Sequence, residues 1–520
     1  MRILFSFIAL AILIWSCQDP AEQRAFQTFV EQHGPKVDIW IKNGQVFSGP
    51  QTKPDLVDLL IHDGRIIYRG AVDSTLLQPN KTIDAMGAIV SPGFIDPHAH
   101  GNPLRTPEFD NFLTMGVTTI MLGQDGSSPL YDTLAQWMDK VDSIDLGVNI
   151  GTFVGHATLR LLSDVGFDSI PNAEGMKKME QLLEKALQDG AFGMSSGLEY
   201  NPGSFAKTAE LNQLAKIVGK YNSLITSHIR NEDDDVVMES IKELLAQAAY
   251  CNVNVSHMKS VYGKGSERAE ELLQLLHETP SNYNITADVY PYTASFTGIG
   301  IVFPDWAKGP NNYDKVKKER RQELLDFLRN RVIARNGPEA TLLGTGDYRG
   351  KTLAQLSQEM NRPFEEILLD IGPRGASGAY FVMDEALQNR LIQDSLVMIC
   401  SDGSPTMNHP RGYGSFAKII EEMVVQKNLL TLNEAIYKMS TQTARIYGLT
   451  DRGELSIGKK ADIIIFKPEE IKAKADFPTP HLLAEGFRYV IVNGKITIDE
   501  EGRKQVNNGV VLKKSVDGND

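Results

Sequence analysis

The feature that most limits the fold of this chain is a repeated alternation of short β-rich runs with amphipathic helical stretches. Eight such runs occur, at residues 89–97, 118–123, 147–155, 191–197, 223–227, 253–256, 285–289 and 396–401. Helical patterns such as AEGMKKMEQLLEKALQDG lie between most of them. Strands that alternate with helices form parallel sheets. Eight in this order predict an α/β fold with a closed (β/α)8, TIM-like barrel. A doubly wound sheet would also fit the alternation, but it fits this count less well.

Additional structure is expected at three places, because 520 residues exceed what one ordinary core accommodates. A long, partly charged stretch separates the seventh run from the eighth and predicts a helical insertion at about 297–390, on the active-site side. Asn-Gly and Asp-Gly pairs within alternating apolar runs near both chain ends predict β-hairpins, at KNGQ, HDGR and VNGK. We therefore predict a small β-sandwich built from residues 36–90 and 448–515, and a barrel domain over residues 91–447.

The N-terminus carries a targeting pattern. Arg2 precedes an apolar run over residues 3–15, which is too short to span a bilayer comfortably and has the length of a signal-peptide core. Ser16-Cys17 follows and resembles a bacterial lipobox, although Trp15 is bulky for that position. The pattern predicts a lipoprotein signal peptide (1–16), lipidation of Cys17 and a linker (17–35). The protein would then be exported and anchored on the periplasmic side of a bacterial cell envelope, touching the membrane only through its lipid. An uncleaved anchor helix is the alternative.

Charge and cysteine content narrow the classes further. The formal net charge is −13 and the chain has no basic stripe, so a nucleic-acid partner is not expected. Besides Cys17, the chain contains Cys251 and Cys400, both in apolar runs that resemble strands. We interpret these two as buried free thiols, so no disulfide is predicted to hold the fold together.

Histidines and one aspartate follow the predicted strands at their carboxyl ends. In the HxH of FIDPHAH the two imidazoles stand two residues apart, so on an extended strand they share one face. HxH alone also suits two solvated loop histidines, but the carboxyl ends of barrel strands converge on one site. Imidazole nitrogens and carboxylates are ligands of divalent metals. The pattern therefore predicts a metal centre made of His98, His100, His228, His257 and Asp402.

An ordered series of motifs resembles the N-acyl-D-amino-acid deacylases (D-aminoacylases) of the amidohydrolase superfamily. The resemblance covers about residues 37–511 and rests on SPGFIDPHAH, GMSSGLEYNPG, SHIRNE, SHMKS, DVYPYTA, SDGSP, HPRGYGSF and GELSIGKKADIIIF. It implies one or two metal ions held by the HxH, the two single histidines and the aspartate. It also implies hydrolysis of the amide bond of a small-molecule N-acyl-D-amino acid; the D configuration is implied by the resemblance only.

One position departs from the family pattern. Members of this branch usually carry a metal-binding cysteine after the second strand, whereas this chain has LGQDGSS with Asp125 in that place. A carboxylate can bind zinc and can bridge two ions, and it is a harder donor than a thiolate. We therefore expect Zn²⁺ held by nitrogen and oxygen ligands, with Mn²⁺ or Co²⁺ as alternatives. The other interpretation of Asp125 is a cap of the following helix.

The expected chemistry follows from these ligands. A bound metal ion lowers the pKa of water and makes hydroxide available near neutral pH. Asp402, as ligand and general base, would take the proton of the attacking water and return it to the departing amine. The resemblance implies that Arg411 and Lys259 bind the substrate carboxylate, with Tyr290 and Tyr200 adding phenol donors. Loss of Asp402 is expected to lower kcat, and loss of Arg411 mainly to raise KM.

Several alternatives stay open. His156 and Glu199 also follow strands and could contact substrate or be structural, and Phe296 replaces a small polar residue of the family pattern. A related amidase, such as a dipeptidase, a dihydroorotase or a hydantoinase-like cyclic amidase, is the second functional hypothesis. Those relatives often use a carboxylated lysine on strand four, and GAFGMSSGLEY contains no lysine. A non-catalytic binding protein on the same scaffold is the third.

Overall fold

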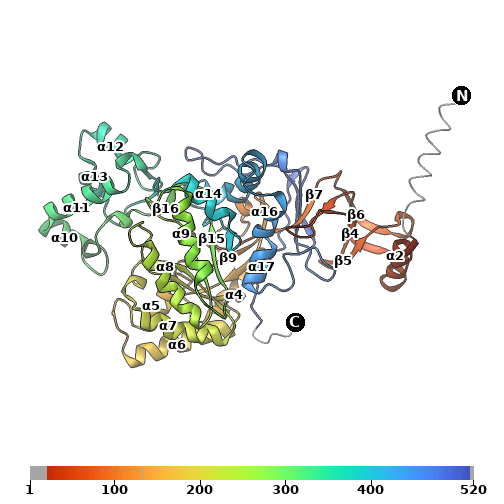
Figure 1. Cartoon of the computed structure of the whole chain (residues 1–520), viewed down its shortest axis with the longest axis horizontal. Coiled ribbons are helices and arrows are strands. Elements are labelled where there is room, and N and C mark those ends of the chain that lie inside the picture. The colour runs from red at the N-terminus through yellow and green to blue at the C-terminus, as the bar shows by residue number, and fades with distance from the viewer. Residues whose placement is uncertain (1–19, 132, 516–520) are drawn as a thin grey trace.

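The computed structural model describes residues 20–131 and 133–515. Residues 1–16 and Cys17, on which the predicted signal peptide and lipid attachment depend, lie outside the described residues. None of the helices in the described ranges has the length and apolar character needed to cross a bilayer. The molecule is elongated, with helices α10–α13 at one end and sheets made from both chain termini toward the other (Figure 1).

Parallel strands form the centre of the molecule. One sheet has the order β10-β9-β8 and a second the order β11-β12-β13-β14-β15-β19. Their bounds are β8 Phe94–Asp96, β9 Val117–Leu122, β10 Asn149–Thr152, β11 Val154–Gly155, β12 Gly193–Gly197, β13 Leu224–His228, β14 Asn252–Val255, β15 Ile285–Val289 and β19 Val397–Ile399. Only Phe153 separates β10 from β11. At the opposite edges a parallel bridge joins Ala99 to Gly403, just past β8 and β19.

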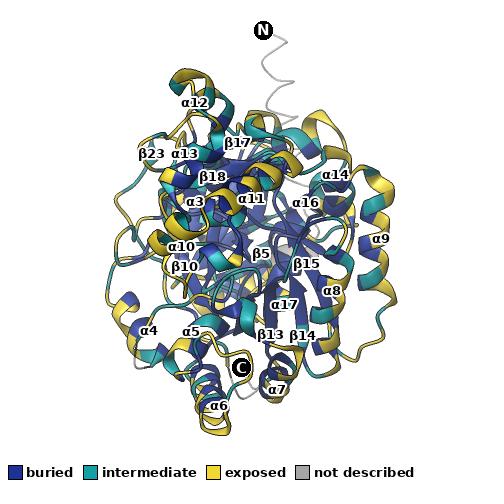
Figure 2. Cartoon of the chain, turned by 90° about the vertical axis from the view of Figure 1, so that its left-hand side faces the viewer, coloured by how far each residue is buried: buried dark blue, intermediate teal, exposed yellow. Residues whose placement is uncertain are grey.

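Helices cover these strands from outside. They include α3 Asp110–Leu113, α4 Leu134–Asp142, α5 His156–Leu162, α6 Ala173–Gln188, α7 Thr208–Lys220, α8 Val237–Leu245, α9 Gly265–Glu278 and α14 Glu385–Gln393. After β19 come α15 Arg411–Lys418, η7 Ile419–Gln426, α16 Leu432–Met439 and α17 Thr441–Tyr447. Figure 2 shows the strands buried in the centre and helices with exposed outer faces around them. The α6 sequence explains this: Met176, Met179 and Leu183 recur at helical spacing and are buried.

The first predicted strand, residues 89–97, is wrong as a single element. It is divided at Gly93 into β7 Ile89–Pro92 and β8, which belong to different sheets. β7 pairs with β20 Ile463–Phe466 in a sheet of the chain termini, whereas β8 pairs with β9. The reason is steric, because a Cβ on residue 93 would lie 2.2 Å from Oγ1 of Thr118. Glycine lets the chain cross between the sheets at this close approach.

The insertion after β15 contains more than the predicted helices. Helices α10 Tyr313–Glu319, α11 Arg321–Ala334, α12 Leu353–Met360 and α13 Phe364–Ile371 are joined by a small antiparallel sheet of order β16-β18-β17, with bounds Ser295–Gly298, Ser377–Tyr380 and Thr341–Leu343. Leu324, Leu328, Leu356 and Leu368 belong to a separate hydrophobic cluster here. The strands are three or four residues long, too short for an alternating pattern to reveal them.

Two further sheets contain both ends of the chain. The orders are β5-β4-β1-β6 and β23-β22-β21-β20-β7-β2-β3. Their remaining bounds are β1 Lys36–Lys42, β2 Gln45–Val46, β3 Asp55–Leu56, β4 Asp58–His62, β5 Arg65–Gly70, β6 Gln78–Asp84, β21 Phe487–Val492, β22 Lys495–Asp499 and β23 Gly502–Arg503. A single cluster of buried aliphatic residues includes members of both sheets, such as Ile41, Ile61, Val90 and Ile465.

Two of the three predicted hairpins are confirmed. β4 pairs with β5 across Asp63-Gly64, and β21 with β22 across Asn493-Gly494, with positive φ at all four turn residues. The hairpin at Asn43-Gly44 is wrong, since β1 pairs with β4 and β6 while β2 pairs with β3 and β7. A Cβ on residue 44 would lie 2.4 Å from Cγ2 of Val90, so glycine here permits a close crossing.

The predicted bounds of the terminal regions need two corrections. Residues 20–33 form helix α2 Pro20–His33, not a linker, because its Phe26 and Phe29 are buried against Tyr68. The last residues of the predicted 448–515 segment leave the terminal sheets. Bridges pair Gly509 with Leu146 and Val511 with Ile150, so this tail lies along β10.

A buried ionic network ties the terminal sheets to the parallel strands. The carboxylate of Asp462, just before β20, accepts three hydrogen bonds. The donors are the Arg452 guanidinium, Nδ2 of Asn149 in β10 (3.1 Å) and the backbone N–H of Asn493 (2.7 Å). Arg452 and Asp462 are both buried. Arg452 also contacts Asp451, whose side chain is 41% exposed.

Asp462→Ala should therefore destabilise the fold strongly, since it leaves the Arg452 charge buried without its main partner. We expect a loss of about 3–5 kcal/mol in the free energy of unfolding. Asp451→Ala removes the exposed partner of the same guanidinium and should cost only about 0–1 kcal/mol. Denaturant titration of both variants measures the difference, and equal losses would show that the buried pair has no special role.

Candidate metal centre

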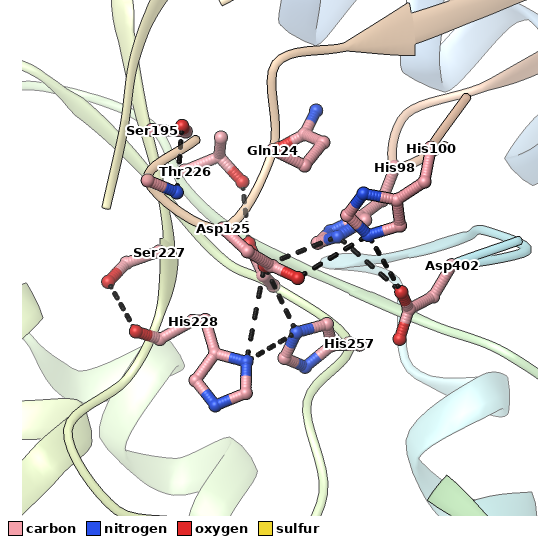
Figure 3. Close-up of polar contacts among 12 residues, drawn as sticks. His98, His100, Gln124, Asp125, Ser195, Thr226, Ser227, His228, His257 and Asp402 are labelled. Atoms are coloured by element: carbon pink, nitrogen blue, oxygen red, sulfur yellow. Dashed lines mark hydrogen bonds and ion pairs between the residues drawn. The ribbon is translucent and has the colours of Figure 1, made fainter. Parts of the chain in front are cut away.

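The six predicted ligands lie together at the carboxyl ends of the parallel strands (Figure 3). One potential metal-binding group contains His98, His100, Asp125 and Asp402, with ligand atoms all within 4.8 Å of one another. A second contains Asp125, His228 and His257 under the same limit. Asp125 belongs to both groups, so the geometry suits two neighbouring ions that share one carboxylate.

Asp125 stands between four imidazoles. Its Oδ1 lies 3.3 Å from Nε2 of His257, 3.4 Å from Nε2 of His98 and 4.0 Å from Nδ1 of His228. Its Oδ2 lies 3.4 Å from Nε2 of His100. The alternative role as a helix cap is excluded, because the next helix, α4, begins at Leu134 and is capped by Thr133.

Unpartnered nitrogens show that these residues fit a cation. The His98 side chain is fully buried, and neither of its ring nitrogens has a hydrogen-bond partner among the described residues. A buried imidazole without partners is costly, and a metal ion at the shared centre would satisfy it. Asp125, His257 and Asp402 also have positive φ angles of 56°, 35° and 48°. Such backbone conformations concentrate at functional sites.

Buried acids support the ligands from behind. Asp288 accepts a hydrogen bond from the backbone of His257 (2.8 Å) and lies 3.7 Å from Nδ1 of His98. Asp96 accepts hydrogen bonds from the backbone N–H groups of His98 and Ser401, both 3.1 Å, and its burial raises its pKa to about 7. Sequence reasoning missed both acids, although each lies at or near the end of a predicted strand.

Asp402 has a different partner for each oxygen. Oδ1 lies 3.1 Å from Nε2 of His100, and Oδ2 lies 2.9 Å from the Arg411 guanidinium. Burial alone would raise the pKa of Asp402, but Arg411 and His257 outweigh it and hold that pKa below its ordinary value. Asp402 is therefore held in its ionised form, and its contact with Arg411 fixes its orientation.

Lys259 is also held in a charged contact beside the ligands. Its Nζ donates to Glu232 (2.6 Å) and lies 2.7 Å from Nδ1 of His257. Burial lowers the pKa of Lys259, but Glu232 outweighs it, so the net direction is upward. Glu232 was missed in the sequence, although it belongs to the SHIRNE motif. Glu199, which was left open, contacts Nε2 of His228 at 3.0 Å.

A cavity of about 430 Å³ opens beside this centre. Its lining includes every predicted substrate-binding residue, namely Lys259, Arg411, Tyr290 and Tyr200. Arg411 lies 4.7 Å from the centre of the Tyr290 ring, and the Tyr200 hydroxyl is 3.2 Å from that of Thr297 in the insertion. Phe296 and Arg335 of the insertion also line the cavity.

His156 is not part of this cavity's lining. Its Nε2 contacts Oε1 of Glu210 at 2.7 Å, and Arg160 donates to the same carboxylate. All three residues are buried. His156 thus belongs to a structural network between α5 and α7.

Cys251 and Cys400 are buried free thiols, as predicted.

Comparison with known proteins identifies the family of this chain. The Amidohydrolase family model matches residues 371–498. The N-acyl-D-glutamate deacylase of Alcaligenes xylosoxydans xylosoxydans is 30% identical over 486 residues, covering 88% of this chain and 93% of that protein. The N-acyl-D-aspartate deacylase of the same organism is also 30% identical, over 484 residues, with coverages of 88% and 91%.

A solved structure is similar over nearly the same length. It is the N-acyl-D-glutamate deacylase from Bordetella bronchiseptica, in complex with zinc and a phosphonate inhibitor that mimics the tetrahedral intermediate of its reaction. The sequence identity is 27% and the TM-score 0.80, with 92% of this chain and 100% of that chain covered. By the identity and coverage of these relatives, the chain belongs to the N-acyl-D-amino-acid deacylase family of the amidohydrolases, as its motifs predicted.

Proposed function

We propose that this protein hydrolyses the amide bond of N-acyl-D-amino acids and releases a carboxylate and the free D-amino acid. One observation carries the proposal: five of the six potential ligands and two cations, Lys259 and Arg411, line one cavity, and His98 lies buried behind it. An N-acyl-D-amino acid whose amide bond lies beside the ligands would place its α-carboxylate on these cations. Arginine suits this task through bidentate contact with a carboxylate.

The residues that would hold zinc are the two groups that share Asp125. His98, His100 and Asp402 complete one group, and His228 and His257 the other. Bound zinc supplies a Lewis acid and lowers the pKa of water toward neutrality. Zn²⁺ accepts such nitrogen and oxygen ligands, and Mn²⁺ or Co²⁺ remain compatible with them. One or two ions fit the proposal, which assigns Asp125 the place of the family's cysteine.

The protein's own residues would move the protons. Asp402 takes a proton from the water that attacks the carbonyl carbon, and the new C–O bond forms. Asp402 then gives this proton to the amine nitrogen as the C–N bond breaks, because an amide anion is a very poor leaving group. With Oδ2 in contact with Arg411, Oδ1 lies beside Nε2 of His100 and faces the potential ligands.

The expected division of roles between Asp402 and Arg411 needs revision. The sequence analysis assigned chemistry to one and substrate binding to the other, but the two side chains are in contact at 2.9 Å. Nε of Arg411 has no partner and suits a substrate carboxylate. Arg411→Ala would therefore release Asp402 as well as the substrate, and should lower kcat in addition to raising KM.

The architecture proposed with this function is a barrel flanked by a sandwich. The bridge between Ala99 and Gly403 supports closure of the strands from β8 to β19 into a (β/α)8 barrel. The aliphatic cluster shared by the two terminal sheets supports a β-sandwich.

The related cyclic amidases remain the second functional candidate. Their carboxylated lysine has no counterpart here, since β12 at Gly193–Gly197 contains no lysine.

A substrate screen tests the function directly. The metal-loaded enzyme should hydrolyse N-acetyl-D-amino acids faster than the L forms, dipeptides, hydantoin or dihydroorotate. Asp402→Asn should lower kcat by about 10²–10⁴-fold, the usual contribution of general acid–base catalysis. Metal content must be measured in parallel, because Asp402 is also a ligand. Preferential hydrolysis of the cyclic amides would instead favour the second candidate.

Metal analysis tests Asp125. Because this carboxylate faces all four imidazoles, Asp125→Ala should lower bound metal and activity together, as measured by mass spectrometry of the dialysed protein and by amide hydrolysis. Asp125→Cys, which restores the family's residue, should retain part of both and favour zinc. Normal metal content and rate in the alanine variant would remove Asp125 from the ligand set.

We further propose export and lipid attachment at Cys17, on the strength of the sequence of residues 1–17 alone. Stable anchoring requires more than one acyl chain, as bacterial lipoproteins carry. Mass spectrometry of protein from the native host should find a mature chain that begins with acylated Cys17. Detection of Met1 or of an unmodified Cys17 would contradict this proposal.

A further inference from the structure

The cavity has a wall that the reaction described above does not use. Arg335 directly follows helix α11 in the insertion and lines the same cavity as Asp402 and Arg411. Only 3% of the residue is exposed. The insertion therefore adds to the cavity a buried cation that the proposed hydrolysis does not use.

The guanidinium of Arg335 is poorly satisfied. Its Nε is buried and has no hydrogen-bond partner. The nearest carboxylate, that of Asp233, is 3.6 Å from Nη1, and the ring centres of Tyr380 and Tyr262 lie 5.3 Å and 6.0 Å away. A guanidinium offers five N–H donors, and a buried charge is costly unless it is paired and hydrogen-bonded. Among the described residues, none accepts a hydrogen bond from Nε.

The balance of charges around Arg335 also favours binding of an anion. Asp233 also contacts Arg331 at 2.6 Å, so one carboxylate faces two guanidinium groups and this wall keeps one positive charge. The other two cations of the cavity have closer partners. Lys259 lies 2.6 Å from Glu232, and Arg411 lies 2.9 Å from Asp402. Arg335 is thus the lining cation with the longest carboxylate contact.

We propose that Arg335 binds a second carboxylate of the substrate, that of an acidic D-amino-acid side chain. The preferred substrates would then be N-acyl derivatives of D-glutamate or D-aspartate. This inference rests on the proposed function, in which Arg411 and Lys259 hold the α-carboxylate. The hydroxyls of Thr345 and Ser377, 3.0 Å apart, also line the cavity and add hydrogen-bonding groups to it.

The test compares N-acetyl-D-glutamate with its neutral isostere N-acetyl-D-glutamine, using the metal-loaded enzyme. The wild type should prefer glutamate. Arg335→Met should lower kcat/KM for glutamate by roughly ten- to a hundred-fold, mainly through KM, because it removes a charged hydrogen-bond partner. Hydrolysis of glutamine should change little, and Arg335→Lys should recover part of the preference.

Arg331→Met is the matched control. Arg331 lies on the same helix and contacts the same Asp233, but it is not part of the cavity lining. It should retain the preference for glutamate. An equal loss of preference in both variants would mean that the pair acts through the folding of the insertion, and would overturn the assignment of Arg335.

Two further results separate this inference from the function on which it rests. A wild-type enzyme that hydrolyses neutral N-acetyl-D-amino acids and rejects glutamate would overturn the role of Arg335 while the proposed function stands. Absence of hydrolysis for all N-acetyl-D-amino acids at full metal content would refute the proposed function itself. If Arg335→Met instead abolished a preference for N-succinyl- over N-acetyl-D-leucine and left glutamate unaffected, the second carboxylate would belong to the acyl group, against the proposal.

Discussion

The contact on which the site depends is that of one carboxylate, Asp125, with four imidazoles. Parallel strands bring their carboxyl ends to a common edge, so side chains distant in sequence converge there. The arrangement has a cost, because His98 is fully buried and neither ring nitrogen forms a hydrogen bond with a described residue. Arrangements of this kind persist only where another group completes them. Hydrogen bonds from the backbones of His257 and His98 to Asp288 and Asp96 indicate that buried acids of the fold position these ligands.

The insertion adds a second set of residues to the site. The strands supply the potential ligands, whereas the insertion supplies Phe296, Thr297 and Arg335 to the cavity. Most of a separate hydrophobic cluster lies within the insertion, so this segment has packing of its own. Segments added to a rigid scaffold often carry binding residues.

Much of this arrangement could be predicted from the sequence, for reasons that differ by feature. Five ligands were predictable because each lies at the end of an apolar run, and strand ends converge. Asp125 was predicted only through the family resemblance, because it stands in the place of the family's cysteine. The contact between Asp402 and Arg411 was not predictable, because sequence spacing does not give the rotation of α15. Glu232, Asp288 and Arg335 were missed because single charged residues are usually exposed. The failure at Gly44 and Gly93 has one cause: glycine marks both tight turns and close crossings, and the pattern alone does not separate them.

The position of helix α2 has a consequence for how the molecule could face a surface. α2 packs against the terminal sheets, at the end of the long axis away from the insertion (Figure 1). The cavity, by contrast, lies between the strand ends and the insertion, which lines part of it. A tether attached ahead of α2 would hold the molecule by one end and leave the insertion, beside the cavity, directed outward. Such an enzyme would sample substrates diffusing in the surrounding solution, rather than molecules embedded in the surface that carries it.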